Sequence, residues 1–170
     1  MNRRRMPEPM VRWMIRRDMA AVMDIENACF GEHAWQEDEF VHFLRQRNAV
    51  GMVALCPRTD DVLGFMLYEL HKGHIALESL AVDPKCHRCG IGTRLMQKLT
   101  GKISERRKRV EALVRDSNLA AHLFFQAIGW RAHVPIVRRP WPDCADDGYR
   151  FVFKHKASPM PLRIAAGTVA

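Results

Sequence analysis

Apolar residues along this chain recur with two periods, one that suits strands and one that suits helices. Short apolar runs bounded by turn residues predict strands at 11–16, 50–56, 62–70, 74–82, 110–115, 130–138 and 148–154. Helical spacing predicts helices over 18–30, 35–47 and 117–129, and a central helix that begins at 91. Short turns join the second, third and fourth strands, so we expect these three to form an antiparallel meander. Asp18 is expected to cap the first helix.

The central helix carries two neighbouring rows of side chains spaced four residues apart. The apolar row consists of Ile91, Leu95, Leu99 and Ile103. The basic row consists of Arg94, Lys98, Lys102 and Arg106. We expect the apolar row to pack against the sheet and the basic row to face water. Gly101 weakens the helix towards its end.

The order of the elements and the 48% share of hydrophobic residues fit one domain with one buried core. We expect this domain to span 10–155, with a flexible basic arm at 1–9 and a loose tail at 156–170. No segment approaches the roughly 20 apolar residues of a membrane span. Arginines interrupt the region that a signal peptide would need. A soluble cytoplasmic protein without a membrane partner is therefore expected.

Cysteine content and charge narrow the class of protein further. The five cysteines are an odd number at scattered positions, which favours reduced thiols over a secreted disulfide framework. The formal net charge of +8 suits a solvated surface, an anionic cofactor or an anionic partner. Aromatic residues are not interleaved with the basic runs, so no stable nucleic-acid partner is expected. The oligomeric state stays open, with a homodimer among the options.

The stretch from 77 to 99 predicts a site for a phosphorylated ligand. An apolar strand stops at Asp83-Pro84, a basic turn carries glycines at 90 and 92, and the central helix begins at once. Glycine leaves no Cβ in the way, so successive backbone N–H groups at the helix N-terminus can point at phosphate oxygens. The helix dipole and Arg88 add positive potential. We therefore expect an anion cradle here.

Two nucleotide motifs do not fit this cradle. A Walker loop ends in Gly-Lys-Ser/Thr, which this turn lacks, and a Rossmann turn has a third glycine where Leu95 stands. The segment His87-Arg88-Cys89-Gly90-Ile91-Gly92 instead resembles the acyl-CoA signature of the GCN5-related N-acetyltransferase (GNAT) family, with His87 in place of the usual Gln or Arg. The segments 114–118 and 127–130 resemble a second block of the same family.

The resemblance covers 11–155 and is closest to ribosomal-protein N-terminal acetyltransferases of the RimI type. It implies an α+β GNAT fold, in which helices flank a mostly antiparallel mixed sheet that bulges and splays at the acyl-CoA site. It also implies acetyl-CoA as the cofactor, an amine acceptor, and polarisation of the thioester by strand amides. The cofactor-binding residues that it implies are Leu80, Ala81, Val82, His87, Arg88, Cys89, Gly90, Ile91, Gly92, Thr93, Asn118 and Phe125. Asn118 has an alternative role in starting its helix.

The general base is where this chain departs from its relatives. RimI-type enzymes have a glutamate at the position of Leu113, which cannot take a proton. Glu78, two residues from the strand amides, is our first candidate, and its alternative is a plain surface glutamate. Glu111 is the second candidate, because it shares a strand face with Leu113. His74 shares the parity of Glu78 and could act through water, although a loop role is the commoner one for such a histidine.

The general acid is also altered. Relatives have a tyrosine on the helix after Asn118, at the position of Phe125, and a phenyl ring cannot donate a proton. The chain has two tyrosines, so a phenolic acid must be Tyr68 or Tyr149, and of these we take Tyr149 as the candidate. Otherwise water or direct release of the thiolate does this work.

The Cys86-x-x-Cys89 pair admits a zinc or redox interpretation. A structural zinc site needs a second ligand pair, and no other C-x-x-C or H-x-x-x-H spacing exists here. A redox pair normally opens a helix on a thioredoxin-type core, whereas these cysteines precede phosphate-loop glycines. We therefore expect no metal site.

Together these features predict transfer of an acetyl group from acetyl-CoA to a primary amine. A protein N-terminal α-amine is the leading acceptor, by resemblance only. A small-molecule amine is the alternative, because the 139–147 loop departs from the tyrosine-rich RimI type. Because Leu113 and Phe125 stand where relatives have a glutamate and a tyrosine, a third hypothesis is an acyl-CoA-binding sensor that has lost catalysis.

Overall fold

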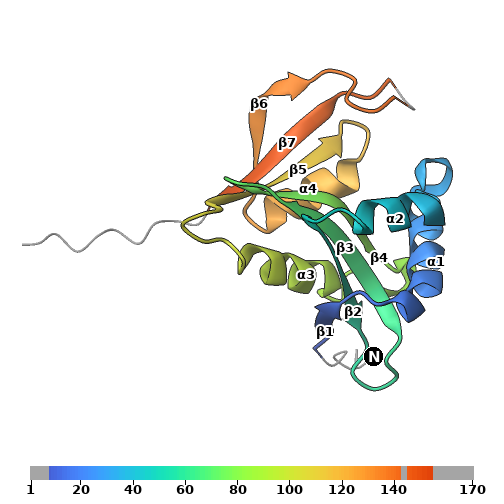
Figure 1. Ribbon diagram of the computed structural model, residues 1–170. Helices are drawn as coiled ribbons and strands as arrows, with labels where there is room; N and C mark the ends of the chain where they lie inside the picture. The colour runs from blue at the N-terminus through green and yellow to red at the C-terminus, as the bar shows by residue number, and fades with distance from the viewer. Residues whose placement is uncertain (1–7, 143–144, 155–170) are drawn as a thin grey trace, which may run out of the picture.

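The computed structural model describes residues 8–142 and 145–154, which form a twisted seven-stranded sheet between helices (Figure 1). The strand order is β1-β2-β3-β4-β5-β7-β6, and neighbours run antiparallel except for β4 and β5. The strands are β1 (Met10–Trp13), β2 (Ala49–Leu55), β3 (Val62–Leu70), β4 (Ile75–Val82), β5 (Arg109–Arg115), β6 (Arg131–Val137) and β7 (Gly148–Lys154). The predicted antiparallel meander is confirmed as β2-β3-β4.

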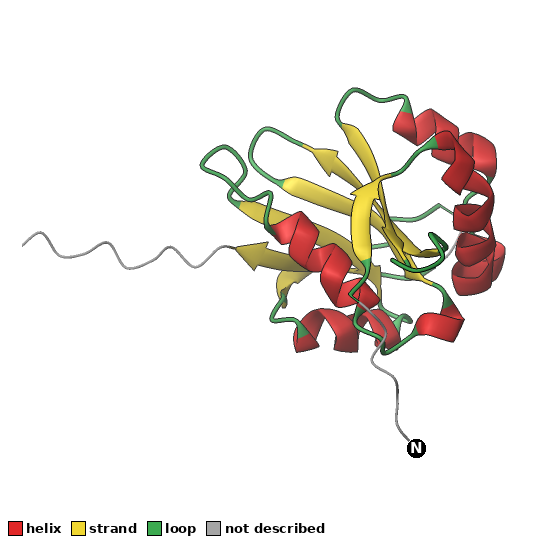
Figure 2. Cartoon of the chain, turned by 90° about the horizontal axis from the view of Figure 1, so that it is seen from below, coloured by secondary structure: helices red, strands yellow, loops and turns green. Residues whose placement is uncertain are grey.

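Helices cover both faces of the sheet (Figure 2). The α-helices are α1 (Met19–Phe30), α2 (Glu37–Leu44), α3 (Ile91–Thr100) and α4 (Leu119–Ala127). Three short 3-10 turns occur at η1 (Arg16–Asp18), η2 (Gly31–His33) and η3 (Pro84–Cys86). In Figure 1, α1 and α2 lie on one side of β2–β4, and α3 lies on the other.

The sheet has a separate apolar core on each face. Under α3 and α4, the buried row Ile91, Leu95 and Leu99 packs with residues from β2, β3, β4, β5 and β7. Under α1 and α2, Val22 and Phe40 pack against residues of β2, β3 and β4 such as Phe65. The apolar row of the central helix therefore faces the sheet as predicted, with Ile103 just beyond the helix end.

The predicted bulge and splay lie on β4. Leu67 of β3 pairs with Ser79, but its neighbour Tyr68 pairs with Leu77, so Glu78 is an extra residue in β4. On the other side, β4 and β5 pair over three residues, Ile75–Leu77 with 110–112, and part beyond that point. The backbone ladder is therefore open between the C-terminal halves of β4 and β5, and we call this opening the crevice. These features confirm the predicted GNAT fold class.

Two expectations about the segment before α1 were wrong. The first strand ends at Trp13 rather than at residue 16. Asp18 precedes α1, yet its carboxylate makes no capping bond to that helix. It instead accepts hydrogen bonds from the Arg12 guanidinium at 2.6 and 2.8 Å and from the Ile15 amide at 2.8 Å. Because Arg12 stabilises the ionised form, the pKa of Asp18 lies below its usual value.

The basic row of α3 does not face water throughout. Lys102 follows the helix end, and its ammonium lies 5.2 Å from the ring centre of Trp13 and 5.9 Å from that of Tyr68. Desolvation there lowers the pKa of Lys102.

Among the described residues, no helix is both long and apolar enough to cross a membrane.

Candidate functional site

The loop between β4 and α3 forms a cradle of backbone N–H groups. Arg88 and Gly90 have positive φ angles of 61° and 81°, which turns successive amides to one side. The first amides of α3, at 91–93, have no partner within the helix. Within the described ranges, the N–H groups of 88–93 also have no other hydrogen-bond partner. The loop therefore offers a ready site for an anion.

The two glycines of the cradle serve different purposes. A Cβ added at Gly90 would meet no protein atom within 4 Å, so it would project into open space. A Cβ added at Gly92 would come within 3.3 Å of the Phe124 ring on α4. Gly90 therefore supplies the positive φ of the turn, and Gly92 lets α3 approach α4.

The crevice between β4 and β5 holds free strand amides. The Asp83 N–H donates to the Leu63 carbonyl on β3 at 2.9 Å. Because successive residues of a strand point their N–H groups to opposite sides, those of Leu80 and Val82 point into the crevice. The N–H of Ala81 was expected to serve together with these two, but it points towards β3 instead.

The Val82 carbonyl joins the cradle to the rest of the site. The Cys29 thiol of α1 donates to this oxygen at 3.3 Å, and the His87 ring nitrogen Nε2 lies 2.9 Å from it. Desolvation raises the pKa of Cys29, so its thiol keeps its proton. His87 thus folds back onto the end of β4.

The bulge places Glu78 on the sheet face opposite α3 and α4, at the point where β4 and β5 part. Its side chain is exposed, and among the described residues its carboxylate has no hydrogen-bond partner. Surrounding protein nevertheless desolvates the carboxyl and, with the Glu69 carboxylate, raises its pKa, while His71 opposes the shift. A carboxylate that is free of partners and has a raised pKa suits a general base.

Glu111 lies on the same face, but its carboxylate is already paired with arginine side chains. Its Oε1 accepts a hydrogen bond from the Arg109 Nε at 2.5 Å, and its Oε2 lies 3.7 Å from the Arg150 Nε. Partial burial works to raise the pKa of Glu111, but the bond and charge of Arg109 outweigh it, so the pKa is lowered. Glu111 is therefore a weaker base than Glu78.

The aromatic candidates lie on the opposite face, with α3 and α4. Tyr68 is fully buried, and this raises its pKa to about 12. Tyr149 is half-buried, and its ring packs edge-on against His122 of α4 with centroids 5.2 Å apart. Phe125 is only 4% exposed and stacks on Phe151, so it belongs to the core in this structure.

Asn118 caps α4, since its Oδ1 accepts a hydrogen bond from the Ala121 amide at 3.0 Å. This is the helix-starting role that the sequence held open as its alternative. Cys86 and Cys89 are free thiols, and no group of three metal-ligating side chains gathers anywhere in the described part of the chain.

Comparison with known families decides what this arrangement is. Residues 19–130 match the model of the acetyltransferase (GNAT) family. The chain belongs to the GNAT family. That match includes the cradle, the β4 bulge and all of β5, so the acyl-CoA-dependent N-acyltransferase class follows for this GNAT chain. Among curated protein sequences, none matches it significantly.

Solved structures show the same fold at low identity. The ribosomal-protein-S18-alanine N-acetyltransferase from Escherichia coli is 20% identical, with a TM-score of 0.72, over 91% of this chain and 98% of that one. An aminoglycoside 6'-N-acetyltransferase complexed with coenzyme A is 13% identical, with a TM-score of 0.68, over 89% and 99%. A chain of the NatC complex bound to Gag peptide and CoA is 15% identical, with a TM-score of 0.69, over 88% and 99%.

Several side chains around the GNAT crevice were not predicted from the sequence. His71 pairs with Glu69 at 2.9 Å and stacks on His74, with ring centres 4.7 Å apart. Arg150 approaches Glu111 from β7. Parity along the strands could have found these residues, because Glu69 and His71 alternate with the core residues Tyr68 and Leu70.

Proposed function

We propose that this GNAT chain transfers the acetyl group of acetyl-CoA to the α-amine of a protein N-terminus. The observation that carries the proposal is the crevice where β4 and β5 part, with the anion cradle at one end and Glu78 at its edge. This arrangement brings a phosphate site, unpaired strand amides and a base to one opening.

The residues present fit acetyl-CoA. When bound, this cofactor supplies an activated thioester, whose carbonyl carbon an amine can attack. The open amides of 88–93, in the turn for which Gly90 supplies the positive φ, suit its pyrophosphate. Arg88 and Cys89 lie on the exposed edge of the same loop. The inward N–H groups of Leu80 and Val82 suit an acyl oxygen.

Glu78 accepts the proton of the acceptor's ammonium, directly or through one water. An ammonium cannot attack a carbonyl until it has lost a proton, so a base at the crevice edge raises the reactive fraction. The raised pKa of Glu78 brings its proton affinity closer to that of the amine. Glu111, held between Arg109 and Arg150, is the second candidate for this role.

Tyr149 is the remaining phenolic candidate for protonating the departing thiolate, because Tyr68 is sealed in the core. Its contact with His122 places it on the α4 side of the sheet, opposite Glu78. A base and an acid on opposite faces would suit two substrates that enter from opposite sides.

The peptide acceptor is supported by the titles of two structural relatives, one a ribosomal-protein alanine N-acetyltransferase and one a complex bound to a peptide. The aminoglycoside acetyltransferase supports the alternative, a small-molecule amine. In the described part of the chain, α1 and α2 leave the β5 side of the sheet face beside Glu78 bare, which favours the peptide because an extended chain can lie across it.

A screen of acceptors tests the proposal. Release of free thiol from acetyl-CoA is measured with lysine-free peptides, the same peptides blocked at the N-terminus, polyamines and an aminoglycoside. We expect turnover with the free peptides alone, and mass spectrometry should place the added acetyl group on the α-amine. Turnover with small amines alone would show that the acceptor is a small-molecule amine and not a protein N-terminus. Tight acetyl-CoA binding with no acceptor turned over would favour a sensor.

A further inference from the structure

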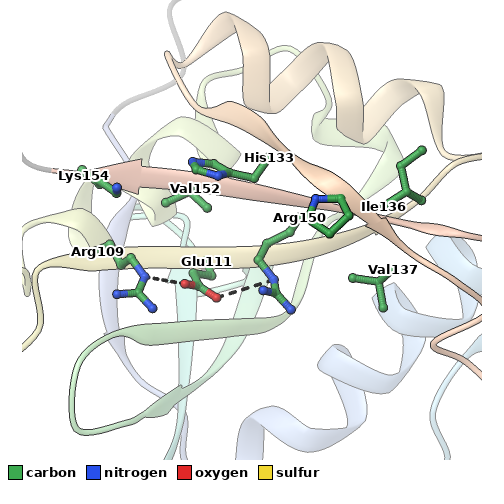
Figure 3. A pocket seen from close by; sticks show the side chains of 9 residues that line it. Arg109, Glu111, His133, Ile136, Val137, Arg150, Val152 and Lys154 are labelled. Carbon is green, nitrogen blue, oxygen red and sulfur yellow. Dashed lines mark hydrogen bonds and ion pairs between the residues drawn. The ribbon is translucent and has the colours of Figure 1, made fainter.

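The face of the sheet formed by β5, β7 and β6 carries a hollow of about 530 Å³ (Figure 3). As far as the chain is described, the core beneath α1 and α2 takes its sheet residues from β2, β3 and β4, so these helices leave the neighbouring strands bare. The side chains around the hollow are Arg109, Glu111, His133, Pro135, Ile136, Val137, Arg150, Val152 and Lys154.

The hollow has a surplus of positive charge. Arg109, Arg150 and Lys154 contribute three cations, and Glu111 contributes one carboxylate. Glu111 lies between the two arginines (Figure 3). Its 3.7 Å separation from the Arg150 Nε is too long for a hydrogen bond. The guanidinium of Arg150, half exposed, therefore keeps its donors for a second carboxylate.

Arg150 flanks the crevice. It pairs with Leu113 in the β5–β7 ladder, and Leu113 is the first residue of β5 beyond the β4–β5 pairing. Adjacent strands lie about 4.8 Å apart and an extended chain advances about 3.4 Å per residue. A peptide whose amine lies in the crevice would therefore bring a side chain to Arg150 about two to four residues from the amine.

Building on the proposed function, we infer that this hollow selects acceptor peptides with an aspartate or glutamate near the N-terminus. Arg150 and Lys154 bind the carboxylate. Ile136, Val137 and Val152 provide an apolar wall for the methylene groups of the acidic side chain. The hollow lies outside the crevice where the acyl group transfers, so the preference for an acidic side chain can be removed without removing acyl transfer.

Matched peptides test the preference. Two lysine-free peptides are compared that differ only by Glu or Gln at the third position. A charge-assisted bond is worth enough that kcat/KM should be roughly 10-fold higher for the Glu peptide. This ratio should fall as salt rises, because the hollow is open to solvent. Equal kcat/KM values for both peptides would overturn the inference.

Variants locate the preference. The double change Arg150→Gln and Lys154→Gln should bring the Glu-to-Gln ratio close to one. Arg150→Glu should do the same, because it leaves two cations and two carboxylates in the hollow. Arg131→Gln is the control, because Arg131 is an exposed cation on β6 that does not line the hollow. It should keep the full ratio. A double variant that retains the wild-type ratio would also overturn the inference.

Direct binding separates this inference from the proposed function. Fluorescence anisotropy of the labelled Glu and Gln peptides, measured with CoA present, requires no turnover. Tighter binding of the Glu peptide that is lost in the double variant would support the hollow even if no peptide were acetylated. Equal binding of both peptides would refute it even if both were acetylated.

Discussion

At the scale of single residues, two glutamates in unlike surroundings are expected to respond to pH in different ways. Glu78 is exposed on a bulge, and among the described residues no hydrogen bond satisfies its carboxylate. Glu26 is 2% exposed on α1, where its Oε1 accepts from the Trp35 amide at 2.9 Å and its Oε2 has no partner in the described part of the chain. The first suits proton transfer, and the second makes the fold sensitive to pH.

The change Glu78→Gln should lower kcat by about 10² or more, because the amide cannot take the proton from the attacking ammonium. Affinity for acetyl-CoA should stay within a few fold, since Glu78 lies outside the cradle. Wild-type activity should rise as pH increases through the raised pKa of Glu78, and the variant should recover partly at high pH, where more amine is neutral. Initial rates from pH 5 to 10 measure this.

Full activity of Glu78→Gln at neutral pH would eliminate this base and move attention to Glu111. The matched variant Glu111→Gln separates the two candidates. It should disturb Arg109 and Arg150 and leave the pH profile of kcat in place.

The change Glu26→Gln should stabilise the fold at alkaline pH. Desolvation raises the pKa of Glu26 from 4.5 to about 7, so the folded state holds this proton after the unfolded state has lost it. Its stabilising effect is complete below pH 4.5 and is lost as pH rises to 7. This rise of the pKa to about 7 corresponds to about 3 kcal/mol at most.

Urea unfolding at pH 5 and pH 8 checks this prediction. Glutamine can still accept from the Trp35 amide, so the variant should gain on the wild type mainly at pH 8. Asp24→Asn changes an exposed carboxylate on the same helix and serves as the control. An equal gain at both pH values would contradict the assignment.

At the scale of elements, the loop that leads into α3 controls cofactor binding. Gly90→Val forces a β-branched residue to φ +81°, which distorts the turn that aligns the amides. Acetyl-CoA should raise the melting temperature of the wild type by mass action, and this shift should vanish in the variant. Differential scanning fluorimetry measures both.

Gly73→Val is the matched control for this loop. Gly73 lies in the β3–β4 turn with no atom within 4 Å of an added Cβ and no positive φ. Its variant should keep the full shift. A normal shift in Gly90→Val would rule out the cradle.

Most elements could be predicted because periodicity and turn residues are local signals. The ends of the strand at 62–70 and the start of α3 needed no tertiary information. The cradle could be predicted equally well, because a strand, two glycines and a helix are consecutive in sequence. Roles that depend on strand register or on residues distant in sequence could not be predicted. The extra residue at Glu78, the pairing of Asp18 with Arg12 and the nearness of Arg150 to Glu111 each require that separate segments already be in place.

At the scale of the whole molecule, fold and cofactor binding should not depend on the cysteine pair. The described residues contain no group of three side chains able to hold a metal. Replacing Cys86 and Cys89 together by Ser should leave the melting temperature and its response to acetyl-CoA nearly unchanged. Stoichiometric zinc in the purified wild type, lost together with the fold in the double variant, would contradict this expectation.

The three residue pairs between β4 and β5 also have a mechanical consequence. The antiparallel ladders on either side are longer, and this short parallel ladder joins them. Widening the crevice would break no backbone hydrogen bond within either antiparallel ladder, but it would strain the buried core under α3 and α4, which takes residues from both. That shared core therefore holds the two ladders in place at the point where their backbones part.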